Sequence, residues 1–261
     1  MTRLFVLTAS RNGDGLRGNG LMVGGHSVLR AVWVGPILLA LAPVVAQAQS
    51  YQCRMPRAIE APFAERSGPV RQVPVTGYTL ALSWSPEFCK GRETKRADAL
   101  QCSGRNGRFG FVLHGLWPES GRTWPQWCPT RNRPTGIDIA RQLCLTPSAR
   151  LVAHQWAKHG ACMVKRPETY FKVSRILWNS LRWPDYDRIS RQKGLTVGDI
   201  RKAFLTANPG WKAEALGVHL DDKGWLEEFK LCYGRNFMPT RCDRARFGAK
   251  DDAPAKIWRG L

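Results

Sequence analysis

The placement of eight cysteines constrains the fold of this chain more than any other feature of its sequence. All eight lie between Cys53 and Cys242, and no pair has the C-x-x-C spacing that structural zinc sites use. An even number of cysteines behind an export signal is typical of disulfides formed in an oxidising compartment. We therefore expect four disulfides among Cys53, Cys89, Cys102, Cys128, Cys144, Cys162, Cys232 and Cys242.

The segment before the first cysteine has the features of a secretory signal. Arg30 precedes an apolar stretch over residues 31–45, and small alanines follow it at the positions that a signal peptidase reads. This pattern predicts cleavage between Ala48 and Gln49, so that residues 1–48 are a presequence and residues 49–261 form a single domain. The mature protein is then secreted or periplasmic.

Two alternatives stay open for the presequence. The stretch before Arg30 is long for the start of a signal, and Met22 gives a better-proportioned start than Met1. The second alternative is an uncleaved membrane anchor. The apolar core disfavours it, because the core is short, ends in small residues and falls below the roughly 18 apolar residues of a spanning helix.

The charge of the chain points to its partner. It carries 40 Lys and Arg against 20 Asp and Glu, a formal net charge of +20. The hydrophobic content of 43% and the 11 tryptophans exclude a disordered polycation. We therefore expect a globular monomer that needs no membrane and no obligate protein partner, and that binds a polyanion.

The pattern along the chain predicts an α+β fold, because strands and helices do not alternate regularly. Strands are expected at 78–84, 108–113 and 225–233, with loops at 87–107 and 118–147. Ser148 is the expected N-cap of a helix over 149–164, and Pro167 opens a second helix. Thr196 and Asp199 have capping-box spacing ahead of a third helix over 200–207.

Two histidine-rich segments carry the candidate chemistry: Leu113–Pro118, at the end of a predicted strand, and His154–Cys162, on a predicted helix. Helical spacing places His154 beside Lys158, and Gln155 beside His159, so that one broad face carries all four. Their positive charges would repel each other unless an anion lay between them. Phosphate is the obvious anion.

Other interpretations of single residues are weaker than the combination. A lone histidine beside Gly and Trp is commonly a satisfied, half-buried side chain, Trp117 and Trp156 suit a core, and Lys158 alone suits a solvated surface. His154 and His159 are five residues apart, outside the i,i+4 spacing of helical zinc ligands. No G-x-S-x-G occurs, and the cysteines are expected in disulfides, so we expect no Ser or Cys nucleophile, no metal and no cofactor.

Together the two segments resemble the ribonuclease T2 family. The first matches its H-G-L-W-P signature over 114–118, and the second matches H-E-W-x-K-H-G-T-C over 154–162. Further similarity covers the strand before Cys89, the Trp-Pro-Gln-Trp-Cys sequence at 124–128, and Cys232 with Cys242. The resemblance implies an α+β fold with a central antiparallel sheet, several packed helices and stabilising disulfides.

The resemblance also implies an endoribonuclease that cleaves single-stranded RNA by transesterification, through a 2′,3′-cyclic phosphate and without metal. RNA supplies its own nucleophile, the ribose 2′-OH, which DNA lacks. The roles it implies are His159 as base, His114 as acid, Lys158 as charge stabiliser, His154 as phosphate ligand, and Trp117 and Glu119 as base contacts. Because aromatic stacking accepts every base, we expect broad base specificity.

Disulfide pairing follows in part from the resemblance. Cys89–Cys102 and Cys232–Cys242 are plausible local pairs, and the resemblance favours Cys128–Cys162, which would tether the helix of His159 to the loop after His114. Cys53–Cys144 then follows by elimination. Residue spacing alone leaves other pairings open.

Gln155 departs from the family pattern, which has Glu at this position. As a candidate catalytic-site residue, Gln155 can still hydrogen-bond a phosphate oxygen or orient a histidine. It carries no charge, so its presence should lower the pKa of nearby histidines. We expect an active enzyme with an altered rate or pH optimum. The alternatives are a catalytically weakened RNA- or polyanion-binding protein on the same scaffold, and a secreted cationic protein that acts on membranes through charge alone.

Overall fold

The computed structural model describes residues 52–260, which lie in one compact unit. The expected presequence and its cleavage site between Ala48 and Gln49 lie outside the described residues. The core of the unit is one antiparallel sheet with helices packed against it, so the α+β expectation is confirmed.

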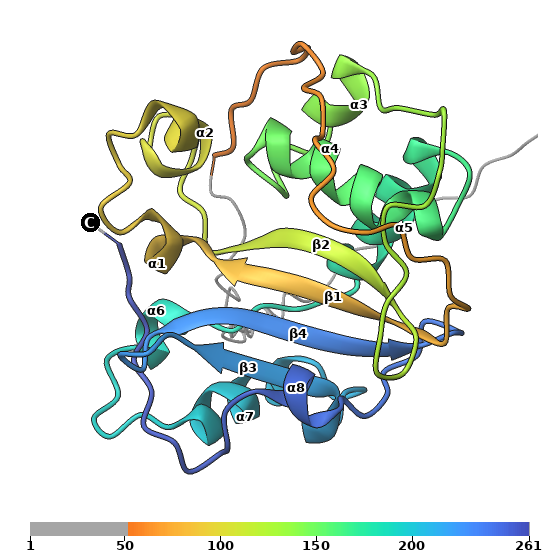
Figure 1. The fold of residues 1–261 in the computed structure, drawn as a ribbon. Coiled ribbons are helices and arrows are strands. Elements are labelled where there is room, and N and C mark those ends of the chain that lie inside the picture. Colours follow the sequence, from red (N-terminus) through yellow and green to blue (C-terminus); the bar gives the residue numbers. More distant parts are fainter. Residues whose placement is uncertain (1–51, 261) are drawn as a thin grey trace, which may run out of the picture. The chain divides into compact units, whose positions relative to one another are not determined.

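The sheet has four strands in the order β2-β1-β4-β3, and every neighbouring pair is antiparallel (Figure 1). Its strands are β1 (Gly77–Trp84), β2 (Phe111–Glu119), β3 (Leu216–Leu220) and β4 (Leu226–Gly234). The central position of β1 and β4 makes them the most constrained elements of the fold, because each is hydrogen-bonded on both sides.

Alternation along the strands separates a core face from a polar face. Leu80 and Leu82 of β1 pair with Leu231 and Phe229 of β4, and all four side chains are fully buried. The polar face carries the residues between them: Thr79 and Ser83 of β1, and Glu228 and Lys230 of β4. Any chemistry that the sheet supports therefore lies on the polar face.

The helices of the described residues surround this sheet (Figure 1). They are α1 (Ser85–Cys89), α2 (Ala99–Cys102), α3 (Gly136–Ala140), α4 (Ala149–Lys158), α5 (Pro167–Asn179), α6 (Tyr186–Ile189), α7 (Val197–Ala207) and α8 (Arg244–Phe247). The group α3, α4 and α5 lies beyond the β2 edge, and α7 lies by β3. Short 3₁₀ helices occur at Arg96–Asp98, Gly160–Cys162 and Ala213–Ala215.

Three helix starts agree with their sequence signals. The Ser148 side chain accepts a hydrogen bond from the backbone N–H of Leu151, as expected of the N-cap of α4. A full capping box joins Thr196 and Asp199, although α7 begins at Val197 rather than at residue 200. Pro167 lies in the first turn of α5.

The expected loops are partly wrong. Residues 87–107 contain the end of α1, a 3₁₀ helix and α2, which are too short for a periodic apolar pattern to reveal. The expected strand 108–113 is instead β2, which begins at Phe111 and continues to Glu119. Pro118 is tolerated there because β2 is an edge strand. The remainder of 118–147 contains α3.

The helix expected over 149–164 ends at Lys158, so this boundary is wrong as well. His159 is its C-cap, and a 3₁₀ helix follows from Gly160. A Cβ at Gly160 would collide with the side chains of Trp156 and Tyr170, which shows how closely this turn is packed. Strand β3 was not expected at all, since it is short and lies at the opposite edge.

Four disulfides join the elements: Cys53–Cys144, Cys89–Cys102, Cys128–Cys162 and Cys232–Cys242. This is the pairing set out above. The described cysteines leave no free thiol. The longest connection, Cys53–Cys144, spans 91 residues and ties the irregular N-terminal segment to the turn that follows α3.

Candidate active site

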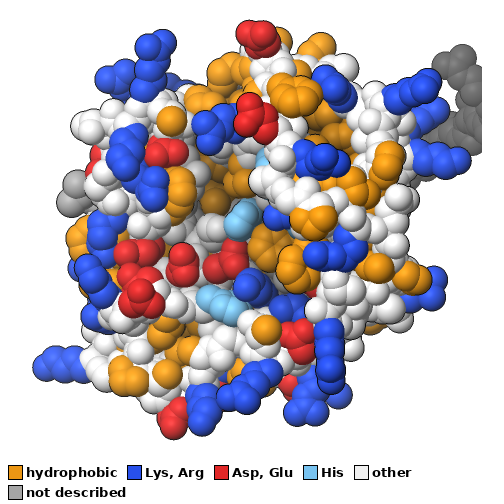
Figure 2. Space-filling model, in the orientation of Figure 1, with side chains coloured by type: hydrophobic (Ala, Val, Ile, Leu, Met, Phe, Trp, Pro, Cys, Tyr) orange, Lys and Arg blue, Asp and Glu red, His pale blue; other side chains and the backbone are white. Residues whose placement is uncertain are grey.

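A groove of about 1070 Å³ opens on the polar face of the sheet. Its walls come from strands β1, β2 and β4 and from helices α1 and α4, and both His114 and His154 line it. Figure 2 shows histidine side chains at the centre of this face, with acidic side chains gathered on one side of them. The groove therefore brings together one histidine from each sequence signature.

His114 enters the groove from an irregularity in β2. Ala81 of β1 pairs with Gly115, and the next residue, Leu82, pairs with Leu113, so His114 is an extra residue in the ladder. Such a β-bulge redirects a side chain and occurs often beside active sites. The His114 side chain keeps 34% of its surface exposed. A regular strand would have aimed it differently.

A carboxylate from another strand contacts His114. Nδ1 of His114 lies 2.8 Å from Oε1 of Glu228 on β4, whose side chain is 14% exposed. Burial acts to raise the pKa of Glu228, but the hydrogen bond with His114 and nearby positive charge outweigh it, so that the net pKa is lowered. Glu228 is therefore ionised at neutral pH and acts only as an acceptor.

His159 has the opposite environment. It is the C-cap of α4 and only 6% exposed. Burial, with smaller contributions from the charges of Lys158, His154 and His114, lowers its pKa from 6.5 to about 2. Among the described residues its Nδ1 has no hydrogen-bond partner. His159 is consequently a neutral imidazole over the working range of pH.

The indole of Trp117 lies between the two histidines. Its ring stacks on His159 with centroids 5.6 Å apart, and it meets His114 edge-on at 5.1 Å. Trp117 therefore contacts both imidazoles and acts as a spacer that separates them within the site. This arrangement places the two signature histidines in one site with contrasting environments.

Gln155 holds that spacer. Its Oε1 accepts a hydrogen bond of 2.8 Å from Nε1 of Trp117, and the residue is only 5% exposed. Gly115 makes the approach possible, because a Cβ at that position would collide with the Gln155 carboxamide. The contact needs an acceptor oxygen, which glutamine supplies as well as glutamate does.

His154 and Lys158 lie one turn apart on α4, as expected. His154 lines the groove and meets Trp127 edge-on with centroids 5.2 Å apart. Burial first, and then the charges of Lys158 and His114, lower the pKa of His154. The four residues expected on one face differ in exposure, because Gln155 and His159 are buried while His154 and Lys158 are half-buried. The end of α4 at Lys158 turns His159 inward.

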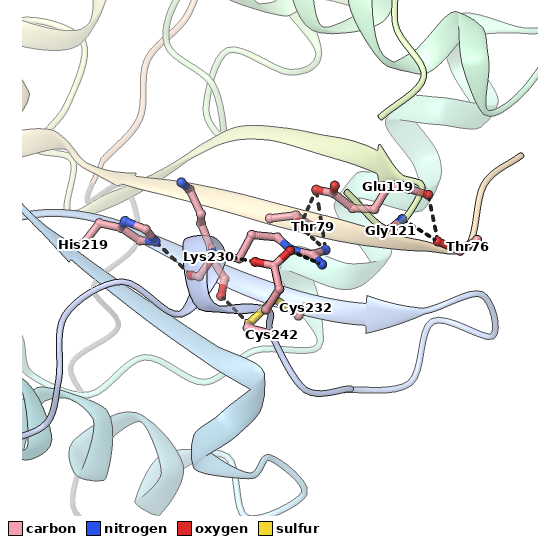
Figure 3. Close-up of polar contacts among 10 residues, drawn as sticks. Thr76, Thr79, Glu119, Gly121, His219, Lys230, Cys232 and Cys242 are labelled. Atoms are coloured by element: carbon pink, nitrogen blue, oxygen red, sulfur yellow. Dashed lines mark hydrogen bonds and ion pairs between the residues drawn. A yellow bond between two sulfur atoms is a disulfide. The ribbon is translucent and has the colours of Figure 1, made fainter. Parts of the chain in front are cut away.

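Glu119, the expected base contact, lies at the end of β2 and is already hydrogen-bonded (Figure 3). Its Oε1 accepts a hydrogen bond of 2.8 Å from Thr79 and lies 3.7 Å from the Arg246 guanidinium. Burial is the main reason that the pKa of Glu119 is raised. It shares the polar face with Lys230, and both of these contacts are made by Oε1.

A covalent and a backbone contact fix the end of α4. Cys128 and Cys162 form a disulfide across the turn that contains His159. The backbone N–H of Trp127 donates to the Lys158 carbonyl at 2.8 Å. The position of His159 is therefore set by the segment that follows β2 as well as by the helix itself.

Sequence reasoning missed Glu228 and Trp127. Glu228 is separated from His114 by 114 residues, and no local motif marks it. The one available signal was its alternation in β4, which places it opposite the core residues Phe229 and Leu231. Trp127 lies in the Trp-Pro-Gln-Trp-Cys sequence that was singled out for its similarity only.

Within residues 52–260, no group of three or more His, Cys, Asp or Glu side chains has the geometry to hold a metal ion. In the same part of the chain, no helix combines the length and apolar character needed to span a membrane.

Comparison with known proteins places the signatures in one family. Residues 76–204 match the model of the ribonuclease T2 family. A probable ribonuclease of Haemophilus influenzae is 35% identical over 184 residues, 66% of this chain and 62% of that protein. A ribonuclease of Aeromonas hydrophila is 47% identical over 85 residues, 33% of this chain and 36% of its own length. The chain thus spans less than two thirds of the length of these two bacterial relatives.

The fold has solved counterparts as well. An RNase-related protein from Calystegia sepium superposes with a TM-score of 0.53 at 21% identity. The superposition covers 68% of this chain and 95% of that protein. At this identity the likeness concerns the fold alone, and it agrees with the expected architecture.

Proposed function

Because the chain belongs to the ribonuclease T2 family, we propose that it is an endoribonuclease that cleaves single-stranded RNA by transesterification. The 2′-oxygen of a ribose attacks the adjacent phosphorus, and the bond from phosphorus to the 5′-oxygen breaks. The products are a 2′,3′-cyclic phosphate and a free 5′-hydroxyl. The polyanionic substrate suits a chain with a net charge of +20.

His159 is the general base in this proposal. A base must begin neutral, and the burial that lowers the pKa of His159 meets that requirement. The negative charge of a bound phosphodiester then raises its affinity for the proton of the 2′-OH. The lowered pKa thus keeps His159 neutral before substrate binds, and the charge of the bound phosphodiester favours transfer of the 2′-OH proton to it.

His114 is the general acid, and the contrast between the two histidines is the observation that carries the proposal. His114 is half-exposed in the groove and faces an ionised carboxylate, whereas His159 is buried among positive charges. A buried neutral imidazole suits the base, and an imidazole whose Nδ1 contacts a carboxylate suits the acid, so the two environments divide the roles. His114 gives its proton to the departing 5′-oxygen.

In this scheme Lys158 stabilises the charge of the phosphorane, and His154 binds the phosphate. Both lie on the last turns of α4, near His159, and burial first, then the positive charge of Lys158, lowers the pKa of His154. A dianionic phosphorane relieves that repulsion more than a singly charged diester does, so these groups favour the transition state. Gln155 acts indirectly, by holding Trp117.

Base recognition in this proposal is broad. Trp117 is held by Gln155 and stacked on His159, and the Glu119 carboxylate is engaged by Thr79. Neither arrangement selects one base by a dedicated hydrogen bond.

We also propose that the mature domain comprises residues 49–261, is exported to the periplasm or the medium, and acts as a monomer. The four disulfides support export.

The test is an analysis of the RNA ends. Purified, oxidised protein is incubated with single-stranded RNA in EDTA, and the fragments are examined by mass spectrometry. Fragments ending in 2′,3′-cyclic phosphate are expected from the wild type and not from His159→Ala, and a matched DNA strand should stay intact. RNA that binds but is not cleaved from acid to neutral pH would contradict the proposal and favour the RNA-binding alternative.

A further inference from the structure

We propose that Glu228 is the positioning residue of His114: its carboxylate accepts the Nδ1–H of His114 and thereby presents Nε2 to the 5′-oxygen that leaves. This inference rests on the proposed function. It goes beyond it by assigning a role to a residue on β4 that neither histidine signature contains.

The direction of the hydrogen bond follows from chemistry. An ionised carboxylate has no proton to donate, so the 2.8 Å contact between Nδ1 and Oε1 requires a proton on Nδ1. Once Nδ1 is committed to Glu228, Nε2 is the only nitrogen of His114 that can carry a proton to or from a substrate. The carboxylate also stabilises the positive charge of the imidazolium, which is the form that an acid must have.

The sheet gives this contact its rigidity. Glu228 pairs with Ser83 of β1 on one side and with His219 of β3 on the other, so its backbone is held by both neighbours. His114 lies on β2, on the far side of β1 from Glu228. The contact between the His114 and Glu228 side chains therefore crosses β1, and it fixes the orientation of the imidazole relative to the sheet. Sites built on strands hold their geometry more closely than sites on loops.

Several other charged groups surround the pair. Lys230 of β4 lies 3.7 Å from the second oxygen of Glu228, and His219 of β3 also acts on its pKa. From α4 and its C-cap come His154, Lys158 and His159, and Glu87 of α1 lines the same groove. Glu228 is the carboxylate in direct contact with His114 among the described residues.

Two substitutions separate the parts of this role. Glu228→Gln keeps an oxygen that accepts the Nδ1–H but removes the charge, whereas Glu228→Ala removes both. The matched control is Glu227→Gln, which removes the same charge from the adjacent, exposed position on the same groove. If only the loss of a negative charge near the groove mattered, Glu227→Gln would show the same defect. If the direct contact with His114 matters, Glu227→Gln would not show it.

The first readout is kinetic. We expect Glu228→Ala to lower kcat by about 10- to 100-fold with little change in KM, and to move the basic limb of the pH profile to lower pH. Glu228→Gln should keep part of the rate but show the same shift of the limb, while Glu227→Gln should stay within about twofold of the wild type. Thermal melting of each variant checks that it is folded.

The second readout does not depend on cleavage. In ¹⁵N NMR of the neutral form, the His114 ring should carry its proton on Nδ1 in the wild type and in Glu227→Gln, and shift toward an Nε2 proton in Glu228→Ala. An unchanged tautomer and a wild-type pH profile in Glu228→Ala would overturn the inference. A wild type that fails to cleave RNA but shows the Nδ1 proton would refute the proposed function while leaving the contact established.

Discussion

At the scale of single residues, the site depends on two imidazoles with unlike surroundings. His159 is buried beneath Trp117 beside Lys158, and His114 is half-exposed against Glu228. The two signatures were sufficient to single out both histidines, because each signature is contiguous in sequence. Glu228 was not recognisable in the same way, since its contact depends on the pairing of β1 with both β2 and β4.

Gln155 is the residue whose interpretation changed most. It was expected to contact phosphate or orient a histidine, yet its Oε1 accepts the Trp117 indole N–H, and its side chain is buried. Either Gln or Glu at position 155 can accept the hydrogen bond from Trp117. The choice between them therefore determines only whether this buried side chain carries a negative charge.

Gln155→Glu should keep the Trp117 contact and place a carboxylate near His159. A negative charge there favours the protonated imidazole and raises the pKa of His159, so less of the neutral base is present at low pH. The acid limb of kcat/KM should therefore move to higher pH, by about one unit. Rates measured from pH 2 to pH 8 check this, and an unchanged rate and profile would show that position 155 does not tune the base.

At the scale of elements, the starts of helices were predictable and their ends were not. Ser148 and the Thr196–Asp199 box act through hydrogen bonds within one turn, so the sequence carries the whole signal. The end of α4 depends on the packing of Gly160 against Trp156 and Tyr170, side chains that meet only in the folded protein. Strand β3 is short and at an edge, so its alternation was too brief to detect.

The Cys128–Cys162 bond should support both stability and activity, because it closes across the turn that holds His159. Replacing both cysteines with alanine should lower the free energy of unfolding by about 3–4 kcal/mol, as expected for a loop of this length. It should also reduce kcat, because His159 and Lys158 lose an anchor. Urea unfolding and RNA cleavage assays measure the two effects.

The matched control is the Cys89–Cys102 bond, which joins α1 to α2 and closes a shorter loop, with a separation of 13 residues against 34. Its double alanine variant should lose about 3 kcal/mol but keep its kcat, because neither cysteine lies beside His159. Equal losses of kcat in the two variants would contradict the anchoring role of Cys128–Cys162.

At the scale of the whole molecule, composition and cysteine placement predicted the class of protein, and family resemblance supplied the antiparallel sheet. The strand order β2-β1-β4-β3 brings β4, late in the chain, beside β1, and nothing local in the sequence specifies that neighbour. The polar face, the groove and the contact between His114 and Glu228 all follow from it. This is why the histidines of the two signatures could be identified from the sequence, whereas the contact with Glu228 could not.

Three histidines with lowered pKa values should make the stability of the molecule depend on pH. Burial is the leading cause that lowers the pKa of His154, His159 and His219. Below pH 6.5 these histidines take up protons in the unfolded chain but resist protonation in the folded one. The stabilisation is therefore complete above pH 6.5 and is lost as the pH falls toward the folded values.

For His159 alone, the loss between pH 6.5 and pH 5 should be about 2 kcal/mol. Urea unfolding at pH 7 and pH 5 measures it, and His159→Asn should show a smaller difference between the two conditions. Equal unfolding free energies at both values for the wild type would mean that His159 is more accessible to protons than its burial indicates.

The division of labour between His159 and His114 is tested most directly with a dinucleotide whose leaving 5′-oxygen is replaced by sulfur. A thiolate leaves without being protonated, so this substrate needs a base but no acid. His114→Ala should cleave it at nearly the wild-type rate while failing on the oxygen substrate, and His159→Ala should fail on both. Equal defects of His114→Ala on the two substrates would contradict the assignment of His114 as the acid.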